Sequence, residues 1–84
     1  MANHYSKVSG FTDWALGVCE DFEAMLGTIG FEREHGLYWL NRYMITAHDE
    51  FDVPGDACLR IIAAYMKDSK VALSELRHLA NYGW

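Results

Sequence analysis

The sequence predicts an all-α fold, a small compact bundle of three to four helices. Apolar residues recur at intervals of three and four, the period of a helix, and not in the alternation typical of a strand. The chain has a single proline, Pro54, which argues against a fold of strands and tight turns. With 84 residues, of which 51% are hydrophobic, the chain has enough apolar material for one core. We therefore expect residues 1–84 to form a single helical domain.

The first helix is expected over residues 12–29. Thr12 is a suitable N-cap, and Asp13 follows in the first turn, where the helix dipole favours a carboxylate. Gly30 is a natural stop at the other end. At about 100° per residue, the apolar side chains gather on one side of this helix: Trp14, Ala15, Val18, Cys19, Phe22, Met25, Leu26 and Ile29.

The second helix is expected over residues 35–51 and contains the segment LYWLNRYMI, residues 37–45. This segment is apolar or aromatic around most of its circumference, which is typical of a helix that is central in its fold or contacts another molecule. Its inward arc is expected to be Leu37, Leu40 and Met44. The two flanks of that arc are Trp39 with Tyr43 and Tyr38 with Ile45. Because so short a chain has few helices with which to cover both, one flank is predicted to be a protein-binding surface.

The third and fourth helices are expected over residues 54–67 and 70–82. Pro54 suits the first turn of a helix, and Ser69 is a candidate cap for the last one. The inward face of the third helix is expected to include Cys58, Leu59, Ile61, Ile62, Tyr65 and Met66. Since the apolar residues on both sides of Ser69 stay in phase, the alternative is one unbroken helix of about 28 residues, roughly 42 Å long. Such a helix would overhang the domain and offer a dimer or partner surface.

The sequence contains no catalytic, cofactor or metal motif of any specificity. Two Glu-x-x-His pairs occur, Glu32 with His35 and Glu75 with His78. Di-metal sites of helical bundles use such pairs together with inward carboxylates from two further helices, which this pattern does not supply. The cysteines and histidines lack the close spacing of zinc ligands: His4, Cys19, His35, His48, Cys58 and His78. We therefore expect no catalytic residue, no metal and no cofactor, with a metal-dependent or histidine-dependent enzyme as the remote alternative.

The formal net charge of −5 and the pI near 5.1 disfavour direct binding to nucleic acid or to an anionic membrane. No apolar run approaches the ~18 residues that a membrane-spanning helix needs. The first ten residues lack the apolar core of a secretion signal, and Cys19 and Cys58 fall on apolar helix faces. A cytoplasmic protein with two reduced, buried cysteines is therefore expected.

A second candidate surface is the acidic face of the first helix, which carries Glu20, Asp21 and Glu23 and has no Lys or Arg beside it. Such a face suits a partner with a basic surface. In size and charge the chain resembles small acidic helical inhibitors encoded by bacteriophages, although it shares no motif with them. The function expected is therefore that of a protein-binding module, an inhibitor or regulator that occludes a larger partner, with a phage-type inhibitor of a nucleic-acid-handling host complex as one form. A homodimer or larger homo-oligomer with a structural role is the alternative.

Overall fold

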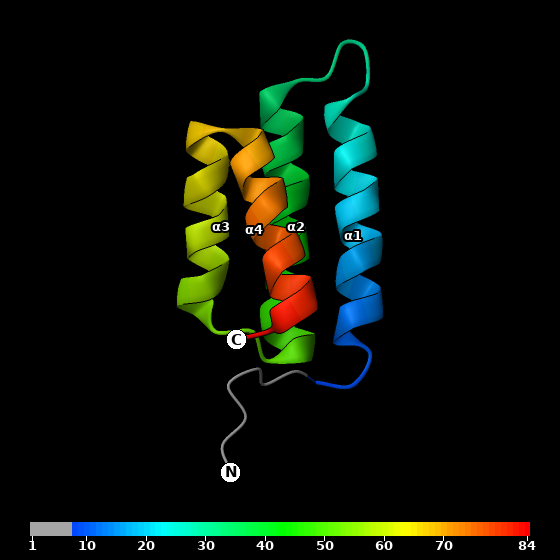
Figure 1. The fold of residues 1–84 in the computed structure, drawn as a ribbon. Coiled ribbons are helices and arrows are strands. Elements are labelled where there is room, and N and C mark those ends of the chain that lie inside the picture. Colours follow the sequence, from blue (N-terminus) through cyan, green and yellow to red (C-terminus); the bar gives the residue numbers. More distant parts are fainter. Residues whose placement is uncertain (1–7) are drawn as a thin grey trace.

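A computed structural model describes residues 8–84, and within that range the chain folds into four helices and no strand. The helices are α1 (Phe11–Leu26), α2 (Arg33–Phe51), α3 (Gly55–Lys67) and α4 (Ser69–Tyr82). They run alternately up and down, with α4 in front, between α1 and α3, and α2 behind (Figure 1). Each helix packs on two others, α1 on α2 and α4, and α3 on α2 and α4. The predicted all-α bundle is therefore confirmed, with four helices.

The core lies along the middle of the bundle and receives one side of every helix. All four helices place apolar residues at helical spacing, so burying one stripe of each removes most of the large side chains from water. The largest fully buried side chains are Phe11, Phe22, Leu40, Val53, Tyr65 and Leu76, together with Cys19.

An aromatic cluster closes the end of the bundle at which α1 begins. The Phe11 ring lies 5.5 Å from Phe51 at the end of α2 and 5.0 Å from Trp84 at the end of the chain, both edge to face. Trp14 stacks on Phe51 at 4.9 Å. Because Phe11 is fully buried in this cluster, the helix includes it and begins one residue before the expected start. Thr12 is therefore not the N-cap; Gly10 occupies that position with a φ of 87° and no side-chain cap.

The first helix also ends earlier than residue 29. The Gly27 amide donates to the Glu23 carbonyl, and the Thr28 hydroxyl donates back to the Ala24 carbonyl at 3.0 Å. These bonds satisfy the last carbonyls of α1 and let the chain leave the helix at Gly27. Ile29, which was expected to face the core, lies instead in the α1–α2 loop and is 100% exposed.

The last two helices are separate. The backbone of Asp68 is extended, with φ −161° and ψ 121°, and its carboxylate accepts a hydrogen bond of 2.8 Å from the Lys70 amide. Asp68 is thus the N-cap of α4, and Ser69 is its first helical residue. The alternative of one continuous helix is wrong, and α4 turns back to pack on α1 (Figure 1).

None of the four helices within residues 8–84 is both long and apolar enough to cross a membrane. The N-terminal residues examined for a secretion signal, and His4 with them, lie for the most part outside the described range.

Candidate protein-binding surface

Exposed apolar side chains gather on the outer side of the groove between α2 and α3. Tyr38 and Ile45 of α2 are 54% and 61% exposed, and Leu59 and Met66 of α3 are 66% and 51% exposed. Ile62 lies half-buried among them. We call these five residues the α2/α3 face.

Helix geometry explains why these five residues share one surface. Residues 38 and 45 are two turns apart on α2, and residues 59, 62 and 66 follow one another along one side of α3. The two helices are antiparallel, and contacts between Arg33 and the Tyr65–Met66 backbone place the start of α2 beside the end of α3. Tyr38 therefore lies toward the Met66 end of the face, and Ile45 lies toward the Leu59 end.

A groove of about 310 Å³ runs along part of this face. Ile45, His48 and Asp49 contribute to its wall from α2, and Cys58, Leu59 and Ile62 contribute from α3. The Nδ1 of His48 donates to the Val53 carbonyl oxygen at 2.8 Å, which fixes the imidazole beside the turn between the helices. The groove is thus mostly apolar, with an acidic residue and a fixed histidine at one end.

The opposite flank of α2 is turned toward α1. Trp39 and Tyr43 are half-buried, with ring centroids 6.0 Å apart, and Tyr43 packs against the core. Burial raises the pKa of the Tyr43 phenol, and the nearby Asp21 carboxylate on α1 raises it further. Of the two flanks singled out in the sequence, the structure therefore exposes Tyr38 and Ile45 and largely covers Trp39 and Tyr43.

The acidic residues of α1 do not behave as one group. Glu20 and Asp21 are exposed, whereas Glu23 forms an ion pair of 2.7 Å with Arg77 of α4. Both partners of this pair are about half exposed, so the pair contributes little to stability. It does neutralise part of the acidic face, which is consequently less acidic than its sequence indicates.

Leu59 and Met66 were expected to face the core, and this prediction is wrong. The third helix is apolar over more than half of its circumference, and α2 and α4 cover only part of it. An apolar surface that covers more than half of a helix indicates that part of it stays exposed. The same reasoning singled out residues 37–45. Applied to the third helix, it would have found the α3 half of the face.

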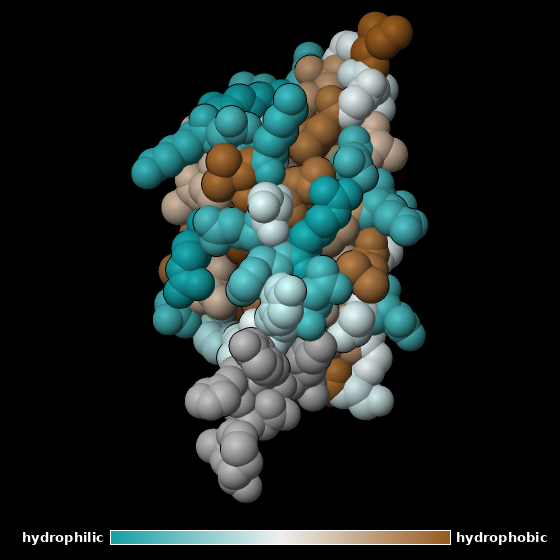
Figure 2. All heavy atoms as spheres, viewed as in Figure 1, coloured by the Kyte–Doolittle hydropathy of each residue, from teal (hydrophilic) through white to brown (hydrophobic). Residues whose placement is uncertain are grey.

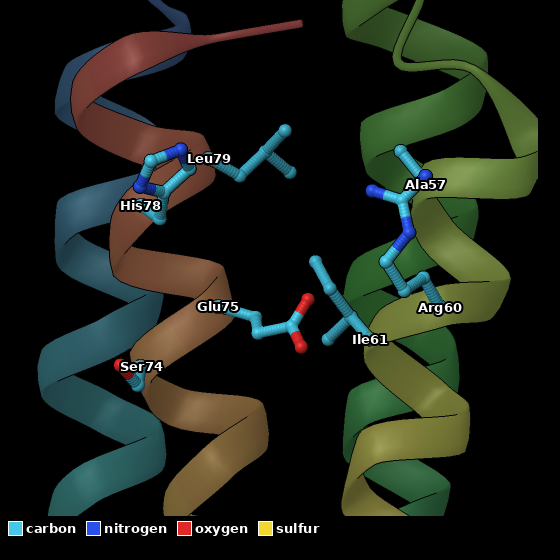
Figure 3. A pocket seen from close by; sticks show the side chains of 7 residues that line it. All are labelled: Ala57, Arg60, Ile61, Ser74, Glu75, His78 and Leu79. Carbon is cyan, nitrogen blue, oxygen red and sulfur yellow. The ribbon is translucent and has the colours of Figure 1, made fainter.

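A second groove, between α3 and α4, carries polar side chains (Figure 3). Glu75 extends from α4 across this groove toward Ile61 of α3. The ring of His78 lies 4.7 Å from that of Tyr82 on the same helix. Within residues 8–84, no three His, Cys, Asp or Glu side chains lie close enough together to hold a metal ion.

Both cysteines are buried in the core. Burial raises the pKa of the Cys19 thiol; the Arg77 guanidinium lowers it by less, and the Glu23 and Glu20 carboxylates raise it further. Burial also raises the pKa of the Cys58 thiol, whose Sγ lies 3.6 Å from the Met44 carbonyl oxygen. Since the thiolate is the reactive form, these are the surroundings of inert thiols.

The side of the bundle over α4 differs from the α2/α3 face. Figure 2 shows it covered mostly by hydrophilic side chains, with some apolar surface visible between them. No protein-family model, curated protein or solved structure matches this chain.

Proposed function

We propose that this chain is a small acidic protein-binding module that acts as an inhibitor or regulator by occluding a larger protein, and that it binds through the α2/α3 face. The observation that carries the proposal is the apolar surface of these two neighbouring helices: four of their large apolar side chains are at least half exposed, and two of them, Ile45 and Leu59, line one groove with Ile62. Contiguous apolar surface of this kind costs solubility and often marks an interaction site.

The composition of the face supports the same proposal. Tyr and Met are enriched in the cores of protein interfaces, and a polar rim usually surrounds such a core. Here Asn41, His48 and Asp49 border the apolar residues. The net charge of −5 adds a preference for a basic partner, and a surface that handles nucleic acid would be one of that kind.

The test compares the wild-type chain with Ile45→Glu/Leu59→Glu and with the control Ile29→Glu. All three positions are well exposed, so each variant should keep its fold, as helical circular dichroism would verify. Each immobilised protein is exposed to an extract of the cells from which the chain comes, and retained proteins are quantified by mass spectrometry. The proposal expects a stoichiometric partner that Ile29→Glu retains and the double variant loses, with direct binding shown between the purified proteins.

Retention of the same partner by the double variant would overturn this assignment of the binding surface. Self-assembly is the second candidate, because the same apolar face could contact a second copy. Sedimentation of the purified chain at micromolar concentration separates the two, since a monomer leaves the face free for another protein.

A further inference from the structure

We infer that the occupant of the α2/α3 face is an amphipathic helix of the partner. This helix carries Lys or Arg beside the end of its apolar stripe that lies against Asp49. The inference rests on the proposed function, because it names the kind of partner that this face fits.

The shape fits a helix. The face runs along two antiparallel helices, and its residues span about 10 Å, or two turns, on each of them (38–45 and 59–66), which matches the span from i to i+7 on a partner helix. A helix that docks in such a groove presents apolar anchors at i, i+3 or i+4, and i+7. Docking of an extended peptide by strand addition requires the free edge of a sheet, and residues 8–84 contain no strand.

The charges at one end of the face are acidic. Between Tyr43 and Leu59 the sequence has no Lys or Arg but contains four carboxylates. Asp49 lines the groove, and Asp52 and Asp56 stand exposed in and after the α2–α3 turn. Positive charge on a partner helix beside this end therefore strengthens binding.

The nearby cationic groups are engaged elsewhere. The Arg42 guanidinium lies 5.8 Å from the centre of the Tyr38 ring, and Arg33 donates to the Met66 carbonyl. Arg60 and Lys67 line the groove between α3 and α4, on the other side of α3. Arg60 lies one turn after Asp56 on α3, but within residues 8–84 no ion pair joins any of these groups to Asp49 or Asp56.

The same charges argue against a second copy as the occupant. Two copies each carry a net charge of −5. A two-fold contact that sets the two acidic ends against each other brings like charges together, which weakens the contact. A basic helix avoids this repulsion.

The test uses two labelled peptides of about sixteen residues, enough for four helical turns. Both carry the same leucine stripe at i, i+4, i+7 and i+11; one has Lys and the other Glu at the positions that flank the stripe at one end. Fluorescence anisotropy at low ionic strength measures binding to four proteins: the wild-type chain, Ile45→Glu/Leu59→Glu, Asp49→Lys/Asp56→Lys and Glu20→Lys/Asp21→Lys. The last two change the net charge equally, so the comparison separates a local effect from one of total charge.

We expect the wild-type chain to bind the Lys peptide about tenfold more tightly than the Glu peptide, as a few rim charges would give. Ile45→Glu/Leu59→Glu should lose both peptides. The preference should vanish or reverse in Asp49→Lys/Asp56→Lys and persist in Glu20→Lys/Asp21→Lys. Absence of binding, equal binding of the two peptides, or a preference that follows Glu20 and Asp21 would overturn the inference, and so would self-association of the chain in sedimentation.

The two proposals fail separately. If the native partner is lost from Ile45→Glu/Leu59→Glu but the peptides show no charge preference, the face binds protein and the basic helix is wrong. If the native partner stays bound to that variant, the proposed function itself is wrong.

Discussion

Arg33 and Tyr65 join the start of α2 to the end of α3, because the side chain of each one contacts the backbone of the other helix. The Tyr65 hydroxyl donates to the Arg33 carbonyl oxygen at 2.8 Å, while the Arg33 guanidinium lies 3.5 Å from the Tyr65 carbonyl oxygen and donates to that of Met66. The Tyr65 side chain is almost fully buried, so its hydroxyl needs this partner inside the protein. The pair aligns the two helices along which the α2/α3 face lies.

Tyr65→Phe should lower the free energy of unfolding by about 1 kcal/mol, because it removes one partly buried hydrogen bond and leaves the ring in place. Urea denaturation followed by circular dichroism measures the change. Tyr38→Phe is the matched control, since Tyr38 is 54% exposed and should change stability little. Equal effects of the two substitutions would show that the Tyr65 hydroxyl does not hold the helices together.

Gly36→Ala should destabilise the bundle by about 1–3 kcal/mol, the usual cost of overpacking. A Cβ at residue 36 would collide with the Tyr65 hydroxyl and would lie 2.6 Å from Cζ of Phe31. Gly17→Ala is the control within a helix, because a Cβ there meets nothing within 4 Å. Alanine favours the helix over glycine, so Gly17→Ala should stabilise by about 0.5–1 kcal/mol. Thermal melting of both variants would reveal opposite shifts, and a fall in the melting temperature of both would refute this assignment.

The close packing at Gly36 is a feature that the sequence alone does not predict. The periodicity of apolar residues was enough to predict a bundle of three to four helices and most of their inward residues, because each stripe depends only on local spacing. Local propensity gives no reason for a glycine in the first turn of α2, because glycine is a poor helix former. Its reason is tertiary, since Phe31 and Tyr65 occupy the space beside it.

The proposed binding surface could be predicted only in part for a similar reason. The sequence showed that residues 37–45 are too apolar to be covered on all sides, but the choice of flank depends on which neighbour lies where. In the structure, α1 covers Tyr43, and the Ile45 flank lies next to α3. Leu59 and Met66 were wrongly predicted to face the core. Periodicity identifies the apolar side of a helix, but it does not tell how much of that side the neighbouring helices cover.

Asp68→Ala should destabilise the protein by about 1 kcal/mol through loss of the N-cap of α4. The carboxylate of Asp68 accepts from the Lys70 amide, and its extended backbone ends α3. Ser69→Ala is the control, because Ser69 lies within the first turn and not at the cap. In urea denaturation, Asp68→Ala should therefore have a clearly lower free energy of unfolding than Ser69→Ala. The reverse order would show that Ser69 is the cap.

Alkaline pH should destabilise the bundle through its buried thiols. Burial raises the pKa of Cys19 and Cys58 above 9.0, the ordinary value. As the pH rises past that value, the unfolded chain loses these protons first, so the folded state binds more protons and stability falls with pH. Stability is therefore fully present below about pH 9 and is lost as the pH rises toward the folded pKa.

The urea midpoint at neutral pH and at about pH 10 measures this loss, and Cys19→Ala/Cys58→Ala isolates the thiols. Burial also raises the pKa of Tyr43 and Tyr65 above 10.0, so the double variant should keep part of the pH dependence but show a smaller fall between the two pH values than the wild-type chain. The comparison uses this fall and not the absolute midpoint, because the alanines also leave cavities that lower stability at every pH. An identical fall in both proteins would assign the alkaline loss to the tyrosines alone.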